Sequence, residues 1–190
     1  MRNNREDAAE NRARVVDAAS RLFRENGYDG IGIASLMKAA RLTNGAFYKQ
    51  FDSKEALIAE ATAQALSENA ASWKRVLATA DGGPLATLTQ WYLDERHLTR
   101  RHDGCAFAAL AGEAPRHEEP VREAFDKGIG ETIERIAAAL NSDDCESAKL
   151  AAIRFLCQLV GSLTLARAVS DPGLARTILD AVRTTDWQSQ

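Results

Sequence analysis

The sequence predicts an all-α protein of about nine helices, in which a small three-helix head at the N-terminus precedes a larger helical body. Alanine is abundant and only 4 of the 190 residues are proline, and both features favour helix. Residues of high β-propensity do not alternate with polar residues over any sustained stretch, so no strand is expected. The hydrophobic content of 45% is ordinary for a globular protein.

The head is expected to hold three helices. The first covers residues 7–26 and ends at Gly27, because glycine readily adopts the left-handed conformation that closes a helix. Its inward face consists of apolar residues at helical spacing, namely Val15, Ala19, Leu22 and Phe23. A second helix over residues 33–40 and a third over residues 43–51, with Thr43 as N-cap, form a helix-turn-helix.

The body is expected to begin with a long helix and then to divide into helices of roughly 10 to 25 residues. Asp52 and Ser53 can cap the long helix, which continues to about residue 79. Clusters of turn-forming residues separate the later helices, at residues 81–84, 103–104, 114–115, 141–144 and 171–173. We therefore expect residues 1–55 to form the head and residues 56–190 to form the body.

The charge of the chain is distributed unevenly between these two parts. Residues 1–55 carry 10 basic and 8 acidic groups, whereas residues 56–190 carry 14 basic and 19 acidic groups. The net charge is therefore positive in the first part and negative in the second, although the whole chain has a net charge of −3. This asymmetry favours a polyanionic partner at the head rather than at the body.

Cysteine usage and hydropathy point to a cytoplasmic protein. The three cysteines are an odd number in a chain large enough to fold without disulfides, which suggests a reducing compartment. The N-terminus lacks the apolar core of a signal peptide, and charged or polar residues interrupt the longest apolar runs. We therefore expect no membrane-spanning segment.

Residues 12–58 contain an ordered set that helix periodicity alone would not require. The set comprises Gly27-Tyr28, Ala40, Leu42-Thr43, Gly45, Phe47-Tyr48, Phe51 and Ser53-Lys54-Glu55. It resembles, without a gap, the N-terminal signature of the TetR family of transcriptional regulators. The resemblance implies a helix-turn-helix that binds double-stranded DNA, a homodimer that meets a pseudo-palindromic operator, an unknown small-molecule effector and no cofactor.

The residues of the expected third helix also suit a recognition helix, which enters the major groove by its N-terminal end. Thr43 and Asn44 can hydrogen-bond to base edges or phosphates, whereas Gly45 and Ala46 keep bulk away from the DNA. Tyr48 and Lys49 would reach the flanking backbone. The resemblance implies that Lys54 is a phosphate clamp, and Arg41 and Gln50 complete the expected contact set. The apolar residues of the segment, Leu36, Leu42, Phe47 and Phe51, are expected to pack the head instead.

The segment departs from the family pattern at several positions. Ile31-Gly32 stands where the family has a Ser or Thr cap, and Met37 where alanine is usual. Arg41 replaces the usual turn glycine and Gln50 the usual histidine. A non-glycine residue in a left-handed turn costs on the order of 1 kcal/mol, which Arg41 can offset by reaching a phosphate.

The body suggests a dimer interface and a ligand cavity by looser resemblance to the same family. Its last two long helices are expected to form the interface, through Leu156, Leu159, Val160, Gly161, Leu163, Leu174 and Ile178; the alternative is that these residues form only the core of one chain. The expected ligand-binding residues are Trp73, Trp91, Tyr92, Cys105, Phe107, Leu110, Phe125 and Ile129. For the aromatic members, ordinary core packing is the competing interpretation.

Cys105 lies in a Gly104-Cys105 stretch that resembles the start of a body helix in part of the family. A thiol at a helix N-terminus can react with oxidants or electrophiles, and the alternative is a small buried side chain that packs a helix start. The spacing of His97, His102 and Cys105 does not favour a metal site. No motif of a hydrolase or redox enzyme is present, so no catalytic residue is expected.

These observations predict a homodimeric, ligand-responsive, sequence-specific DNA-binding regulator, and the resemblance favours a repressor that a small molecule, oxidant or electrophile releases from its operator. The alternative is a helical small-molecule-binding or interaction protein without specific DNA binding.

Overall fold

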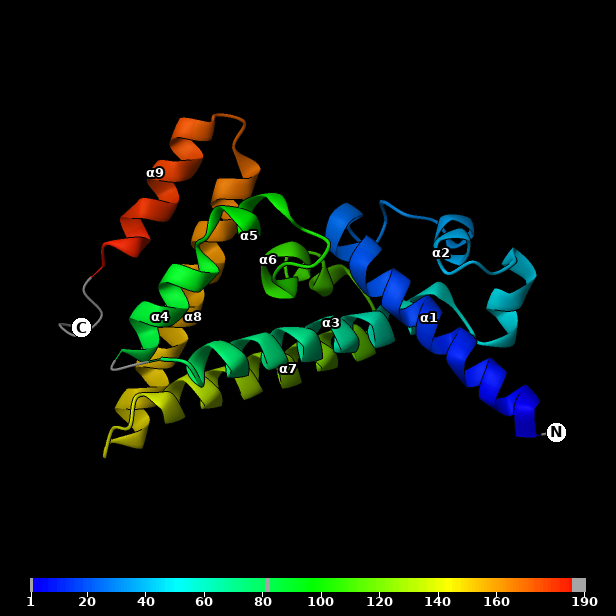
Figure 1. Cartoon of the computed structure of the whole chain (residues 1–190), viewed down its shortest axis with the longest axis horizontal. Helices are drawn as coiled ribbons and strands as arrows, with labels where there is room; N and C mark the ends of the chain where they lie inside the picture. The colour runs from blue at the N-terminus through cyan, green and yellow to red at the C-terminus, as the bar shows by residue number, and fades with distance from the viewer. Residues whose placement is uncertain (1, 81–82, 186–190) are drawn as a thin grey trace. The chain divides into compact units, whose positions relative to one another are not determined.

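The computed structural model describes residues 2–80 and 83–185, and these are organised as helices without a strand (Figure 1). The α-helices of this described part are α1 (Arg2–Asn26), α2 (Ile33–Ala39), α3 (Lys54–Leu77), α4 (Pro84–Tyr92), α5 (Glu95–Thr99), α6 (Ala106–Leu110), α7 (Glu119–Ala139), α8 (Cys145–Ala168) and α9 (Pro172–Arg183). Two short 3₁₀ helices, η1 (Asn44–Lys49) and η2 (Ala114–Arg116), lie between them. The predicted all-α fold is confirmed.

Helix α1 ends where the sequence predicts but begins earlier, at Arg2 rather than near Asp7. Gly27 closes it in the left-handed conformation, with a φ of 77°, and its N–H donates to the carbonyl of Phe23 over 2.8 Å. Of the expected inward face, Val15, Ala19 and Phe23 are buried and Leu22 is half-buried. The left-handed glycine therefore ends α1 by the mechanism expected from the sequence.

Side-chain caps start several of the later helices. Ser53 accepts a hydrogen bond from the N–H of Ala56 over 3.0 Å at the start of α3. Asp144 accepts from the first N–H groups of α8, and Asp171 accepts from the N–H of Gly173 in α9. These caps satisfy backbone donors that the helix itself leaves unpaired. Of the expected break at residues 81–84, Asp81 and Gly82 lie outside the described residues, and Pro84 begins α4.

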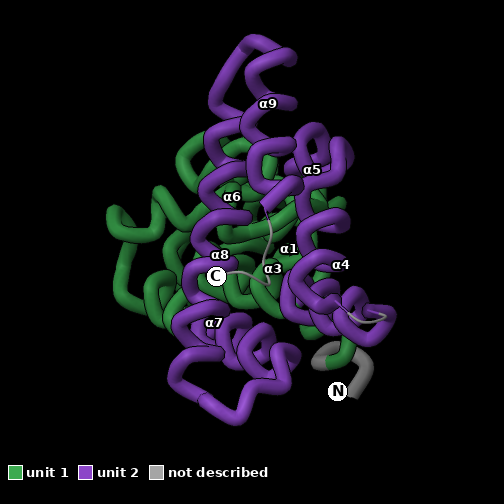
Figure 2. The backbone as a smooth tube through the Cα atoms, turned by 90° about the vertical axis from the view of Figure 1, so that its left-hand side faces the viewer, with its two compact units in different colours: residues 1–67, 102–126 green, residues 68–101, 127–190 purple. Residues whose placement is uncertain are grey.

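The chain divides into two compact units (Figure 2). Unit 1 contains residues 1–67 and 102–126, and unit 2 contains residues 68–101 and 127–190. The unit that holds the head therefore continues past residue 55 into α3 and takes in a second segment of the chain. We keep the division into residues 1–55 and 56–190 as a proposal about function rather than as a description of packing.

Each unit has its own buried core. In unit 1, α1 packs against α2 and α6, and α2 packs against η1. Leu36, Phe47 and Phe51 are buried there as expected, and Leu42 is half-buried. In unit 2, α8 packs against α9, α5 and α4. Its core includes Tyr92, Phe155 and Leu159.

Helix α8 is long and apolar enough to span a membrane by length and composition alone, which the sequence analysis did not expect. In the structure, 39% of its most apolar stretch is buried, and its inward side packs against α9. The apolar composition of the buried part is that of a core helix. The remainder leaves apolar surface on unit 2.

Candidate nucleic-acid interface

The turn between α2 and η1 is closed by Arg41 in the left-handed conformation. Its φ is 58°, and its N–H donates to the carbonyl of Lys38 over 3.1 Å, while the N–H of Leu42 donates to the carbonyl of Met37 over 2.9 Å. This pair of bonds is a Schellman motif, which usually has glycine at the position of Arg41. The strain expected at Arg41 is therefore present. At the other end of α2, Gly32 makes no side-chain cap, as expected.

The expected third helix differs from the prediction in type and length. The sequence predicts an α-helix over residues 43–51, but the structure has the 3₁₀ helix η1 over Asn44–Lys49. Thr43 occupies the N-cap position with extended backbone, and its side chain makes no capping hydrogen bond. Asn44 and Gly45 are poor helix formers, and a short uncapped segment readily tightens into 3₁₀ geometry.

The predicted DNA-contacting residues of this segment lie on a solvent-accessible surface, which we call the reading surface. Tyr48 is 73% exposed. The exposed members are Arg41, Thr43, Asn44, Gly45, Tyr48 and Lys49, and the half-buried members are Ala46 and Gln50. The surface thus combines two cations, hydrogen-bonding side chains and an aromatic ring, which are the groups that contact DNA phosphates and base edges.

Gly45 has no packing role within the chain. A Cβ added at this position would have no other atom within 4 Å, and the backbone there does not require a glycine. Its missing side chain therefore leaves space at the surface rather than in the core. Such space permits the close approach of a partner to the backbone.

Beneath the reading surface, Phe47 and Phe51 stack with ring centroids 5.5 Å apart and an interplanar angle of 28°. The guanidinium of Arg12 lies 4.2 Å from the centroid of the Phe51 ring and donates to the carbonyl of Gln50 and the carboxylate of Glu60. Arg12 therefore ties α1 to the end of η1 and to α3. The sequence does not indicate this contact, because Arg12 and Gln50 are 38 residues apart.

Lys54 does not project freely into solvent. It is half-buried at the start of α3, and its Nζ donates to the carbonyl of Tyr28 over 2.7 Å. An ammonium group has three N–H donors, so two remain for another acceptor. The dipole of α3 favours an anion near this position, since Lys54 is the first residue of a long helix.

Residues 102–126 bring a second set of polar contacts to the head. Glu113 accepts a hydrogen bond from the backbone N–H of Tyr28 over 2.8 Å, and the Nδ1 of His117 lies 3.1 Å from Oε1 of Glu55. The Tyr28 side chain is fully buried, and its hydroxyl lies 2.7 Å from Oγ1 of Thr62. Burial raises the pKa of Tyr28 well above its usual value, against the opposing effect of the Thr62 hydrogen bond. In the sequence, only the places of Tyr28 and Glu55 in the set that resembles the TetR signature marked any of these residues.

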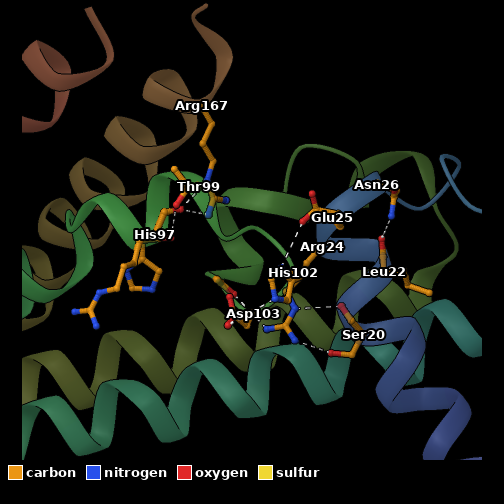
Figure 3. A network of polar contacts seen from close by, with 12 residues as sticks. Ser20, Leu22, Arg24, Glu25, Asn26, His97, Thr99, His102, Asp103 and Arg167 are labelled. Carbon is orange, nitrogen blue, oxygen red and sulfur yellow. Dashed lines mark hydrogen bonds and ion pairs between the residues drawn. The ribbon is translucent and has the colours of Figure 1, made fainter. Parts of the chain in front are cut away.

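Arg24 joins α1 to the loop that precedes α6. It is 5% exposed, and it donates to the carbonyl and hydroxyl oxygens of Ser20 and, over 3.2 Å, to the carbonyl of Gly104 (Figure 3). The next residue, Cys105, is the N-cap of α6 and is 3% exposed. Cys105 thus lies at a helix start beside a loop anchored by a buried arginine. Cys105, Cys145 and Cys157 form no disulfide within the described part of the chain.

The expected ligand-binding residues fall into two groups, one in each unit. Cys105, Phe107, Leu110 and Phe125 belong to unit 1 and are buried, with the rings of Phe107 and Phe125 6.4 Å apart. Trp73, Trp91, Tyr92 and Ile129 belong to unit 2, where the first two are joined by a ring contact at 6.0 Å.

His97 extends the aromatic group of unit 2. Its ring centroid lies 4.8 Å from that of Trp91 and 5.3 Å from that of Tyr92. Arg167 donates to the backbone carbonyl of His97 over 3.1 Å, and both residues are labelled in Figure 3. Burial lowers the pKa of His97, and the charge of Arg167 acts in the same direction, while hydrogen bonding to backbone carbonyls opposes them.

The expected dimer-interface residues divide by exposure. Leu156, Leu159 and Leu163 are buried within one chain, as the alternative of core packing expects, and their place in a dimer interface stays a prediction. Val160, Gly161 and Ile178 are half-buried, and Leu174 is 47% exposed. The sequence analysis missed two further leucines on α8, Leu150 at 46% and Leu165 at 60% exposure. A pattern of apolar spacing cannot distinguish the two faces of a helix that is apolar nearly all round.

His97 belongs to unit 2, whereas His102 and Cys105 belong to unit 1. Within residues 2–80 and 83–185, no group of three or more His, Cys, Asp or Glu side chains gathers at metal-binding distance. His102 instead lies 3.8 Å from a carboxylate oxygen of Glu25, in unit 1.

Comparison with known proteins agrees with this geometry. Residues 15–61 match the model of the tetR family of bacterial regulatory proteins. The transcriptional repressor NemR of Escherichia coli is 24% identical over 142 residues, which cover 73% of this chain and 71% of NemR. A TetR-family regulator from Cytophaga hutchinsonii has the same fold, with a TM-score of 0.78 at 15% identity and 93% coverage of both chains. FadR of Bacillus subtilis, solved with stearoyl-CoA, has a TM-score of 0.61 at 14% identity, with 90% of this chain and 97% of FadR covered.

Proposed function

We propose that this chain, a member of the TetR family of bacterial regulatory proteins, is a sequence-specific DNA-binding repressor that an effector releases from its operator. The observation that carries the proposal is the reading surface, where Gly45 leaves unfilled space beside exposed Asn44 and Tyr48. In this assignment Thr43 and Asn44 contact base edges, while Lys49, Arg41 and Lys54 contact phosphates. Residues 1–55 supply the DNA contacts and residues 56–190 the sensing and dimerisation, in the cytoplasm.

Selection from a pool of random duplexes tests specific DNA binding. We expect the selected duplexes to converge on an inverted repeat, because a two-fold dimer presents two equivalent recognition elements. Lys54→Ala should weaken binding to every duplex and reduce its salt dependence, whereas Asn44→Ala should also change the selected sequence. A pool that stays random after repeated selection would exclude sequence-specific binding and favour a helical sensor or interaction protein instead.

The repressor assignment is tested with a reporter gene placed behind the selected site. Expression of the protein should lower transcription from this reporter, and a reporter with a scrambled site is the control. An increase in transcription would identify an activator instead.

The dimer is proposed to form through the apolar side of α8 and α9 that carries the exposed Leu165 and Leu174 and the half-buried Ile178. Exposed apolar surface of this kind marks an interaction site in soluble proteins, and two-fold pairing would cover both copies at once. Light scattering should give about twice the chain mass of 20.7 kDa. Leu165→Glu should shift the protein to monomer, whereas the exposed Thr164→Glu, also on α8, serves as the control.

The effector is proposed to act on the buried residues of the body. The stearoyl-CoA complex of FadR shows that one structure with this fold holds an acyl-CoA thioester, and a NemR structure is described as the reduced form. Two classes of effector are therefore proposed for this chain, an apolar small molecule and an oxidant or electrophile at Cys105. Thermal-shift measurements against a panel of acyl-CoA thioesters test the first class, since a ligand of the folded state raises Tm.

Hydrogen peroxide and N-ethylmaleimide test the second class, with DNA release as the readout. Cys105→Ser should abolish the response, and Cys145→Ser and Cys157→Ser should retain it. An unchanged response in Cys105→Ser would leave Cys105 as a packing residue at the start of α6.

A further inference from the structure

The backbone of Tyr28 is held at both its N–H and its carbonyl by residues far away in sequence. Its N–H donates to Oε2 of Glu113 over 2.8 Å, and its carbonyl accepts from Nζ of Lys54 over 2.7 Å. Its ring is fully buried. The backbone between Gly27 and Asp29 is therefore fixed by one residue from the segment before α7 and one from the first turn of α3.

A parallel contact holds the next residue of α3. The His117 side chain is 8% exposed, and its Nδ1 lies 3.1 Å and 3.2 Å from the two carboxylate oxygens of Glu55. Its ring centroid lies 4.7 Å from that of Tyr28, at an interplanar angle of 72°. Glu113 and His117 thus reach the same place, Tyr28 and the first turn of α3, by separate contacts.

These contacts determine where the Lys54 ammonium lies. One of its three N–H donors is directed at the Tyr28 carbonyl, and the other two point elsewhere because the ammonium is tetrahedral. A cation held in position before DNA arrives loses less conformational entropy on binding than a free side chain. The position of that carbonyl depends in turn on the bond from Tyr28 N–H to Glu113.

We propose that Glu113 and His117 are positioning residues for DNA binding, which act on phosphate contact through Lys54. The proposal rests on the DNA-binding function proposed above. It adds the contacts of Glu113 and His117 through which the body would control that DNA binding. The segment that carries Glu113 and His117 also carries Cys105, Phe107 and Leu110, all buried in unit 1. A change at those residues that displaces Glu113 withdraws the support from Tyr28 and lowers the affinity for DNA.

A double-mutant cycle between Glu113 and Lys54 tests the route. Binding of full-length protein to one duplex of arbitrary sequence and to the selected duplex is measured by fluorescence anisotropy. Glu113→Ala and His117→Ala should each weaken binding roughly 5- to 20-fold, a range typical of coupled sites. In a Lys54→Met background the same changes should alter affinity less than about twofold. Glu118→Ala, an exposed carboxylate in the same segment, is the control and should leave affinity unchanged.

A merely structural role of Glu113 would give a different pattern. If Glu113→Ala only destabilised the fold, it would lower Tm, and its loss of DNA affinity would be the same with Lys54 present as in the Lys54→Met background. That result would overturn the proposal. The duplex of arbitrary sequence tests the coupling of Glu113 to Lys54 independently of sequence-specific binding, because a phosphate contact by Lys54 does not depend on the sequence. If the wild type binds both duplexes equally, the proposal of sequence-specific binding is wrong. The double-mutant cycle still measures the coupling between Glu113 and Lys54 in that case.

Hydrogen exchange gives a readout that does not require DNA. In Glu113→Ala the Tyr28 amide loses its acceptor, so its exchange should be on the order of tenfold faster. The amides of α8, in unit 2, should exchange at the wild-type rate. An unchanged exchange rate of the Tyr28 amide would show that Glu113 does not hold this N–H. It would overturn the proposal whatever the DNA measurements give.

Discussion

Units 1 and 2 leave different kinds of side chain exposed. Among the described residues, the large exposed aliphatic side chains are Leu150, Leu165 and Leu174, all in unit 2, whereas the exposed large aromatic is Tyr48 in unit 1. Around Tyr48 lie polar and cationic groups and a glycine without a packing role. The difference matches the two partners proposed above, DNA for the reading surface and a second copy of the chain for the apolar side of α8 and α9.

The largest expected effect comes from substituting two adjacent aromatic residues, one on the reading surface and one in the core beneath it. Phe47 is fully buried, so Phe47→Ala should lower the free energy of unfolding by about 3 to 5 kcal/mol. Tyr48 is 73% exposed, so Tyr48→Ala should change stability by less than about 0.5 kcal/mol and still weaken DNA binding. Urea denaturation and anisotropy measure the two quantities. Equal stability losses would contradict the division between surface and support.

Arg12 tests whether the reading surface depends on its anchoring to α1. Arg12→Met removes the contacts with Phe51, the Gln50 carbonyl and Glu60. We expect a stability loss of about 1 to 2 kcal/mol and weaker DNA binding, because η1 loses its tie to α1 and α3. Arg14→Met is the control, since Arg14 is exposed and bonds only locally, to Asn11. A loss of stability with unchanged DNA binding would show that η1 keeps its place without Arg12.

Acid should act on unit 2 through His97. Burial lowers the pKa of His97 in the folded protein. Below about pH 6.5, the usual pKa of histidine, His97 is therefore protonated in the unfolded chain while it stays neutral in the folded protein. Stability from this group is present above pH 6.5 and is lost as the pH falls toward the depressed value, by at most about 1.4 kcal/mol per pH unit.

The His97 effect is measured as the pH dependence of urea unfolding between neutral pH and pH 5. His97→Gln should flatten the dependence, and His102→Gln, whose side chain is 39% exposed, should leave it as in the wild type. A steeper dependence in His97→Gln would reverse the assigned direction.

The smallest expected effects lie at two positions of the reading surface where stability and DNA binding oppose each other. Arg41→Gly relieves the left-handed strain and should raise stability by about 1 kcal/mol, while it removes a cation that we propose contacts DNA. Gly45→Ala should raise stability by about 0.5 to 1 kcal/mol, because the added Cβ meets nothing in the chain, and should lower DNA affinity. A stability gain without any loss of DNA binding at both positions would remove these residues from the interface.

Sequence reasoning recovered the elements whose signals are local. The stop at Gly27, the cap at Ser53 and the strained turn at Arg41 each follow from one residue and its neighbours. The all-α fold followed from composition and spacing. These features could be predicted because the atoms that stabilise them lie within a few residues of one another.

The parts that escaped prediction depend on contacts between distant segments. Glu113 and Tyr28 are 85 residues apart in sequence, and His117 and Glu55 are 62 apart. Nothing in the pattern around either partner indicates the other, so residues 102–126 were assigned to the body although they pack into unit 1. The bond of Lys54 to the Tyr28 carbonyl was missed for the same reason. The 3₁₀ geometry of η1 has a local cause, because Asn44 and Gly45 are poor helix formers.

Gly27 has a consequence for building hybrid proteins from this one. A Cβ at residue 27 would lie 2.7 Å from Oε1 of Glu113, a carboxylate that the Tyr28 N–H already holds in place. A side chain at residue 27 would therefore be crowded by Glu113 as well as strained by the left-handed backbone. A chimaera that joins residues 1–55 of this chain to a foreign body would carry Gly27, Tyr28 and Glu55 without the Glu113 and His117 that match them. For the foreign body to control the proposed DNA binding, it should need a carboxylate in the place of Glu113 and an imidazole in the place of His117.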